Sequence, residues 1–362
     1  MIQNDGIRHA ALDYAEKTAY KSIMKDNPVN VSFPMKVREY QFIVFRNLLY
    51  SIDRALDKGS ISQNARRGLL KNLIGKVVLR DNNARKNFEK EYKTRAPGFV
   101  LISPTSTCNL HCIGCYANSS KYEKIHMEYD VFTRIIREKA ELWGSYFTVI
   151  SGGEPLMWRS NGKSIIDIFR EHKDNYFLMY TNGTLIDKKM AKEMAELGNV
   201  TPAISLEGFE KETDQRRGAG TFKKVLNAFE NLREAGVPFG ISLTATRENA
   251  ELLLSDEFID FCYEEQGAVY GWIFQYMPIG RHFTLDLMVT PEQRLNMFRR
   301  VQYFLKEKKL FLVDFWNSGM ASNGCISAGR CGGYFVVDWK GDVLPCVFFP
   351  YKTHNIIQTY RD

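Results

Sequence analysis

The sequence predicts an α/β fold, a partial (β/α)6 barrel of the TIM type, with a helical N-terminal extension and a small C-terminal β-rich module that carries cysteines. From Phe99 onward, short runs rich in β-branched and aromatic residues alternate with longer segments of helical periodicity. Six such strand–helix units in succession imply a parallel sheet with right-handed crossovers. Polar motifs follow several of the expected strands, and barrels of this type place their chemistry on the loops after the strand C-termini.

The helical extension is predicted over residues 1–97. These residues hold 19 Lys and Arg against 10 Asp and Glu, a net charge of +9, whereas the rest of the chain carries −2. Apolar residues between 69 and 78 recur at helical spacing with basic residues between them. We expect residues 60–97 to dock this apolar stripe on the barrel and to leave the charges in water. The alternatives are an anionic membrane surface or an acidic partner, and nucleic acid ranks last because no aromatic residues are interleaved.

The barrel is expected over residues 98–309 and the cysteine module over 310–362. The predicted strands of the barrel cover 99–103, 146–150, 176–180, 200–205, 239–243 and 269–276, and its helices lie near 128–143, 163–172, 186–196, 221–235, 250–266 and 291–307. In the module we expect a strand at 311–315 and a hairpin of 334–338 with 343–348.

Composition sets the broad class of protein. The chain has 362 residues, of which 44% are hydrophobic and 25% are charged, as in ordinary globular proteins. It shows no apolar run of membrane-span length, and its first residues lack the layout of a signal peptide, so we expect a cytoplasmic protein without a membrane span. Seven unevenly placed cysteines do not form a disulfide framework; in a reducing compartment they more often bind metal or stay free.

Three cysteines, Cys108, Cys112 and Cys115, follow the first expected strand of the barrel. Thiolates on one short loop can ligate three irons of a cubane [4Fe–4S] cluster, which leaves the fourth iron open. Zinc is an alternative, although it usually shows paired C-x2-C motifs and a fourth ligand. Buried or free cysteines are the other alternative. We treat His111 as a loop residue because the cysteines already supply the protein ligands.

This spacing resembles the signature of the radical S-adenosylmethionine (SAM) superfamily. The resemblance implies that the open iron chelates the amino and carboxylate groups of SAM. It further implies that an electron from the cluster cleaves the sulfonium to a 5′-deoxyadenosyl radical, which abstracts hydrogen from a substrate. In that superfamily the residue before the third cysteine is commonly aromatic and packs against adenine. Here it is Gly114, and Tyr116 follows the cysteine instead.

Further motifs come in the order that the superfamily shows. Ser151 to Pro155 resembles the GGE motif that holds the methionine ammonium, and a carboxylate beside flexible glycines suits a cation. Thr181 to Gly183 ends the third strand, where a plain turn is the alternative. Ser205 to Gly208 resembles the segment that binds the ribose hydroxyls. The residues that the resemblance assigns to SAM here are Gly152, Gly153, Glu154, Asn182, Ser205 and Glu207.

Arg217 is our choice for the methionine carboxylate, because a planar guanidinium grips a carboxylate bidentately, although a lone arginine is usually a solvated side chain. No catalytic residue is assigned. The resemblance suggests a ribosomally made peptide or a cofactor precursor as substrate, and an external electron donor such as flavodoxin or ferredoxin. The alternative is a non-catalytic iron–sulfur protein for electron transfer or redox sensing. Such a protein needs only cysteines, so the SAM-type segments favour an enzyme.

The C-terminal part resembles the start of the SPASM and twitch domains, which carry auxiliary iron–sulfur clusters. The candidate ligands are Cys325, Cys331 and Cys346, of which Cys346 ends the run from Gly341. A cubane normally takes four thiolates, so we expect the module to be incomplete in this chain unless the substrate or another residue supplies a ligand. The alternative is a set of reduced structural cysteines.

Overall fold

The computed structural model describes residues 5–26, 33–57, 61–78, 83–322, 324–327 and 332–361. Among these residues, ten strands form one sheet in the order β12-β11-β10-β1-β2-β5-β6-β7-β8-β9, and β3 and β4 (Arg159–Ser160 and Lys163–Ser164) form a separate hairpin. The six strands expected for the barrel are all present and adjacent. They are β1 (Phe99–Ile102), β2 (Phe147–Ile150), β5 (Tyr176–Thr181), β6 (Val200–Leu206), β7 (Gly240–Ala245) and β8 (Tyr270–Gln275).

Every neighbouring pair among these six strands is parallel, as the strand–helix alternation predicts. Side chains alternate between the two faces of the sheet. Val100 and Ile102 belong to the large core between the sheet and the helices, whereas Leu101 belongs to a smaller cluster together with Val149 and Leu178. The smaller cluster lines the inner face of the partial barrel, where the candidate site lies.

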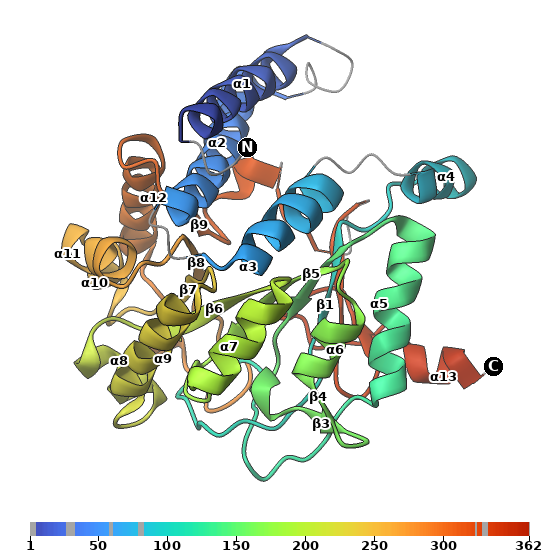
Figure 1. Ribbon diagram of the computed structural model, residues 1–362. Helices are drawn as coiled ribbons and strands as arrows, with labels where there is room; N and C mark the ends of the chain where they lie inside the picture. Colours follow the sequence, from blue (N-terminus) through green and yellow to red (C-terminus); the bar gives the residue numbers. More distant parts are fainter. Residues whose placement is uncertain are drawn as a thin grey trace.

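Helices cover the outer face of the sheet. They are α5 (Tyr129–Trp143), α6 (Ile165–Glu171), α7 (Lys188–Leu197), α9 (Thr221–Ala235) and α12 (Pro291–Lys306), and α5, α6, α7 and α9 run side by side in Figure 1. The single helix expected over 250–266 is instead α10 (Ala250–Leu253), α11 (Asp256–Asp260) and the π-turn η4 (Phe261–Glu265). The break falls at Ser255, whose hydroxyl accepts from Phe258 N at 3.2 Å and starts a new helix.

The C-terminal strands join the barrel sheet at both of its edges. β9 (Leu312–Asp314) pairs in parallel with β8, and β10 (Tyr334–Val337) pairs in parallel with β1. The expected hairpin is formed by β10 and β11 (Asp342–Leu344), and β12 (His354–Asn355) adds to it before α13 (Ile356–Arg361). The cysteine module therefore does not make a sheet of its own, because its strands satisfy the unpaired backbone groups of the barrel's two edge strands.

The N-terminal extension consists of α1 (Asp5–Met24), α2 (Met35–Asp57), α3 (Gln63–Gly68), the π-helix η2 (Leu69–Val78) and α4 (Asn83–Tyr92). α3 and η2 lie under the barrel, where Ala65 and Leu69 cluster with Tyr176 at the start of β5. The expected docking of the apolar stripe is thus confirmed over the described residues of this segment.

Polar contacts fix the extension on the barrel. Asn72 donates to Lys173 O at 2.7 Å, and Lys76 pairs with Asp174 at 3.1 Å. α2 is tied to α12 by the buried Asn47, whose amide donates to Leu305 O at 2.7 Å. The domain boundaries at 97/98 and 309/310 stay predictions. In the described part of the chain, no helix has both the length and the apolar character that a membrane span needs.

Candidate active site

A cavity of about 270 Å³ opens on the inner face of the sheet, at the C-terminal ends of the strands. Segments that follow several different strands contribute to its wall, and this is the edge at which parallel barrels carry their chemistry. The predicted site residues that line it are Cys108, Cys112, Cys115, Gly152, Gly153, Glu154, Asn182, Ser205 and Arg217. The fold therefore brings together motifs that are more than a hundred residues apart in sequence.

The three thiols lie on the loop after β1, and polar groups contact two of them. Cys108 Sγ accepts from Leu110 N at 3.5 Å and from Asn182 Nδ2 at 3.8 Å, and Cys112 Sγ lies 4.0 Å from an Arg217 nitrogen. Burial raises the pKa of the Cys108 thiol to about 12. A coordinated metal removes that proton, so such a thiol becomes a ligand only together with its metal.

Within the described ranges, no group of three or more His, Cys, Asp or Glu side chains is arranged to hold a metal ion. A cubane cluster does not need such a group, because each thiolate binds a different iron. The fit to a cluster therefore depends on three thiols that share one loop and one cavity, and this arrangement is present.

Arg281 braces the cysteine loop, although the sequence does not mark it as a site residue. Its backbone N donates to Cys115 O at 3.0 Å, and its guanidinium donates to Cys112 O at 3.2 Å and also to Ser119 O. A side chain on the preceding Gly280, whose φ is +78°, would come within 2.2 Å of Cys115 O. Gly280 and Arg281 lie several residues after the end of β8, and no local pattern in the sequence marks them as a brace.

Gly114 leaves room for a ring that comes from another part of the chain. Its φ is +64°, and a Cβ there would lie 2.5 Å from Cε2 of Tyr276, which follows β8. The Tyr276 ring is almost fully buried, and its hydroxyl accepts from Thr284 N at 3.2 Å. An aromatic ring thus lies beside the third cysteine, but it is supplied by the end of β8 and not by the loop.

Glu154 is 1% exposed and is held by three donors. Its carboxylate accepts from Thr181 Oγ1 at 2.7 Å, from Asn182 N at 2.9 Å and from Leu156 N at 3.1 Å. Burial nevertheless raises the pKa of this carboxyl, because the charged form is removed from water. A cation in the cavity beside Glu154 would stabilise the charged form of its carboxylate.

The glycines before Glu154 are required by close contacts with residues 103–107 of the same chain. A Cβ on Gly153 would lie 2.2 Å from Thr107 O, and Gly153 N donates to Thr105 O at 2.9 Å. Gly152 has a φ of +103°, a conformation that glycine adopts without strain. The two glycines therefore pack the Glu154 loop directly against the segment that leads into the cysteine loop.

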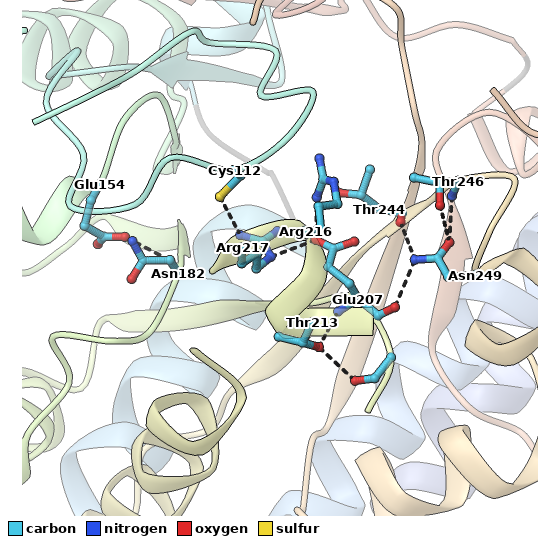
Figure 2. Close-up of polar contacts among 11 residues, drawn as sticks. Cys112, Glu154, Asn182, Glu207, Thr213, Arg216, Arg217, Thr244, Thr246 and Asn249 are labelled. Carbon is cyan, nitrogen blue, oxygen red and sulfur yellow. Dashed lines mark hydrogen bonds and ion pairs between the residues drawn. The ribbon is translucent and has the colours of Figure 1, made fainter. Parts of the chain in front are cut away.

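Glu207 forms a buried ion-pair cluster with two arginines (Figure 2). Its Oε1 accepts from Arg216 at 2.5 Å and from Arg217 Nε at 2.8 Å. Both arginines lie at the end of α8 (Glu210–Arg217), a helix that the sequence analysis does not predict, and Arg216 O accepts from Ile113 N of the cysteine loop at 2.9 Å. Glu207 is fully buried, and its Oε2 accepts no hydrogen bond from the described residues. Glu207 is not among the residues that line the cavity, whereas both arginines paired with it are.

The C-terminal cysteines lie beside the same cavity. The Cys346 thiol lies 3.4 Å from the Tyr334 hydroxyl, and the Cys325 thiol lies 3.3 Å from Ser327 Oγ. Their neighbours Ile326, Val347 and Phe348 line the cavity, although the two cysteines do not. Cys331 lies outside the described residues.

Comparisons with known proteins agree with this architecture. The family model of the radical SAM superfamily matches residues 102–253. An AdoMet-dependent heme synthase of Methanosarcina barkeri is 28% identical over 73% of this chain and 80% of its own length. The mycofactocin maturase MftC of Mycobacterium ulcerans is 30% identical over 71% of this chain and 70% of its own length, and MftC of Mycolicibacterium smegmatis is 32% identical over 70% and 65%.

Two solved structures share the fold. Streptococcus suis SuiB bound to its precursor peptide SuiA has a TM-score of 0.60 at 20% identity, over 77% of this chain and 69% of SuiB. The enzyme anSMEcpe with bound AdoMet and the Cp18Cys peptide has a TM-score of 0.55 at 22% identity, over 71% of this chain and 77% of its own. With the three-cysteine loop, the partial barrel and a relative matched along most of both chains, this protein belongs to the radical SAM superfamily and is an enzyme of that type.

Proposed function

We propose that the chain binds a [4Fe–4S] cluster through Cys108, Cys112 and Cys115, holds SAM beside it, and removes hydrogen from a peptide substrate. The observation that carries the proposal is one cavity lined by the three thiols, by the Glu154 carboxylate and by Arg217. When bound, the cluster supplies the electron that splits SAM into methionine and a 5′-deoxyadenosyl radical. The residues of this chain bind and orient both groups.

The charges around the cavity suit the methionine end of SAM. Glu154 is a buried carboxylate whose pKa is raised by burial, so an ammonium beside it stabilises its charged form. Arg217 reaches between Glu207 and Cys112, which places a guanidinium next to the cysteine loop. A carboxylate that binds near the cluster is therefore within reach of a fixed, planar donor.

The ribose is proposed to bind at Ser205 and Glu207. Ser205 lines the cavity, and Glu207 Oε2 lacks a hydrogen-bond partner among the described residues. A buried acceptor without a partner is costly, and a ribose hydroxyl would satisfy it. Asn182, which donates toward Cys108 and to Asn109 Oδ1 at 2.9 Å, is proposed to couple the cysteine loop to the Glu154 loop.

A peptide is the substrate class that the relatives support best. The matched sequences include maturases, and the solved relatives SuiB and anSMEcpe are named with bound peptides. A cofactor precursor is the second class, because heme synthases are also among the relatives. The electron is proposed to come from an external donor such as flavodoxin or ferredoxin. The proposed compartment is the reducing cytoplasm, where cysteines remain as free thiols.

An auxiliary cluster at Cys325 and Cys346 is a separate proposal. It is supported by the Cys346 thiol, which lies 3.4 Å from the Tyr334 hydroxyl at the cavity wall. The residues that directly follow the two cysteines, Ile326 and Val347, also line the cavity, so a cluster there would lie near the proposed substrate.

The proposal is tested by anaerobic reconstitution of the full chain with iron and sulfide. The wild type should produce 5′-deoxyadenosine when SAM and dithionite are added. The triple variant Cys108→Ala/Cys112→Ala/Cys115→Ala should lose both this product and the chromophore of the first cluster. Product formation by the triple variant would contradict the proposal.

The same reconstitution distinguishes a chain that binds one cluster from a chain that binds two. With an auxiliary cluster, iron analysis should give more than four irons per chain. A Cys325→Ala/Cys346→Ala variant should lose the excess and keep the first cluster. A wild-type value of four irons would show that these two cysteines are structural thiols.

A further inference from the structure

The cavity has two chemically different ends. Its charged lining residues are Glu154, Arg216 and Arg217, and all three lie at the end formed by the loops after β2 and β6. Both arginines are already paired with Glu207. The other end is formed by side chains that project inward from the strands and from the C-terminal segment.

Aromatic rings dominate this second, apolar end. Trp272 and Phe274 project into the cavity from β8, on either side of Ile273, which packs in the outer core. Phe315 and Phe348 lie against Phe274, with ring centroids 5.4 Å and 6.4 Å away. Tyr334 of β10 completes the wall. Among the described residues that line this end, none is charged.

The C-terminal segment contributes three of these rings, namely Phe315, Tyr334 and Phe348. The match to the superfamily model ends at residue 253, so all three rings lie outside the matched residues.

A charged substrate group would be unstable at this end. An ionised carboxylate that loses its water without a cation or donors in exchange carries a large desolvation cost. An apolar group of similar size gains stability there, because it contacts rings that otherwise face an open cavity. The charge distribution of the wall thus selects against carboxylates and for uncharged groups.

We propose that the substrate presents an uncharged apolar side chain, aromatic or branched, to the apolar end, and that this end rejects carboxylate-bearing groups. The proposal rests on the proposed function, because it assumes that SAM occupies the charged end of the same cavity. It names the chemical class of the group that lies nearest to SAM, and it assigns the selection to Trp272, Phe274, Phe315, Tyr334 and Phe348.

The test uses two small probes that differ at one substituent, para-cresol and para-hydroxybenzoate, in which a charged carboxylate replaces the methyl group. Binding to the reconstituted holoenzyme, with SAM and without reductant, is measured by saturation-transfer NMR and titration. We expect para-cresol to bind at least about tenfold more tightly than para-hydroxybenzoate. Equal binding, tighter binding of the carboxylate, or no binding of either probe would overturn the proposal.

Two lysine variants test whether the apolar end of the cavity causes the preference for para-cresol. Phe348→Lys places a cation at the apolar end and should reverse the preference in favour of para-hydroxybenzoate. Phe349→Lys makes the same change one residue later, on a side chain that is 50% exposed and does not line the cavity, and should keep the wild-type preference. A reversed preference cannot result from unfolding. An equal effect of both variants would overturn the assignment to the cavity wall.

The two proposals fail in different ways. Wild-type protein that prefers para-cresol but forms no 5′-deoxyadenosine with SAM and dithionite would contradict the proposed function and retain the apolar site. Protein that forms 5′-deoxyadenosine but shows no preference between the probes would contradict the present inference alone.

Discussion

At the scale of single residues, the site is built from buried charges that other loops hold in place. Glu154 accepts three hydrogen bonds, and Glu207 pairs with two arginines. Buried charges of this kind are costly unless they are paired. The charged side chains of such a site are therefore held in place without a ligand, and a ligand of opposite charge would stabilise them further.

Glu154→Gln should weaken SAM binding and leave the cluster in place. The variant keeps the size of the side chain but removes the charge that the ammonium is proposed to contact. A charge-assisted hydrogen bond contributes about 1.5–3 kcal/mol, so the dissociation constant should rise roughly tenfold to a hundredfold. Equilibrium dialysis of SAM against reconstituted protein measures this, with iron content as the check on the cluster.

The matched control for this change is Glu123→Gln, on an exposed side chain of the same cysteine-loop region. It should bind SAM as the wild type does. An unchanged dissociation constant in Glu154→Gln would remove Glu154 from the SAM site.

Lys139 provides a residue-scale prediction that concerns stability. This lysine of α5 is buried, and its ammonium donates to Ser145 O at 2.7 Å and to Asn175 Oδ1 at 2.8 Å. Burial lowers its pKa from 10.5 to about 7. Between these values the unfolded chain binds one proton more than the folded chain, so the contribution of Lys139 to stability rises with pH.

We therefore expect the wild type to gain stability relative to Lys139→Met as the pH rises from 7 to 9, by up to about 1.4 kcal/mol per pH unit. Urea denaturation of both proteins at each pH measures the difference in the free energy of unfolding. A difference that stays constant with pH would mean that Lys139 remains charged in the folded state.

At the scale of elements, α3 and η2 close the end of the barrel opposite the site. The contact depends on two glycines, because a Cβ on Gly68 would lie 1.8 Å from Gly198 O. Ser62 N also donates to Gly236 O at 2.8 Å, so the segment is fixed to the loops before β6 and β7. A helix placed this close to a loop tolerates no added side chain.

Gly68→Ala should therefore destabilise the protein by roughly 1–3 kcal/mol, because the added methyl group displaces α3 from the barrel. Gly75→Ala is the control in η2, since a Cβ there meets only Leu70 O at 3.4 Å. That change should be neutral or stabilising, because alanine favours helices over glycine. Thermal denaturation compares the two; equal melting temperatures would contradict the close contact.

At the scale of the whole molecule, the chain closes its barrel with both of its ends. The basic N-terminal quarter covers the bottom, and the C-terminal strands extend the sheet at β1 and β8. The apolar stripe that a basic amphipathic helix would insert into a membrane is thereby occupied by the barrel. Its charges are in part paired, as in the contact of Lys76 with Asp174.

We expect that the full chain does not co-sediment with vesicles of phosphatidylcholine and phosphatidylserine at about 0.15 M salt, where exposed charges are screened within about 8 Å. The measurement is made again at low salt and at high salt. Co-sedimentation at physiological salt that disappears at high salt would instead show that the basic face binds anionic surfaces.

The sequence by itself determined the strand order of the barrel and the cysteine loop. Both are local signals: β1, β2 and β5 are short runs rich in apolar and aromatic residues between longer helical segments, and the Cys108–Cys115 spacing lies within eight residues. The motifs at Glu154, Asn182 and Ser205 could also be placed, because parallel strands bring their C-terminal ends to one edge.

Only the tertiary structure decided how these parts meet. The sequence does not predict α8, the brace from Arg281 to the cysteine loop, or the Tyr276 ring against Gly114, and the last two join residues that no local pattern relates. The same holds for β10, which lies more than two hundred residues after β1 and pairs with it directly. Local periodicity determines whether a segment forms a helix or a strand. The partners of that helix or strand depend on unpaired sheet edges and on the space left in the core, and such edges and spaces exist only in the folded chain.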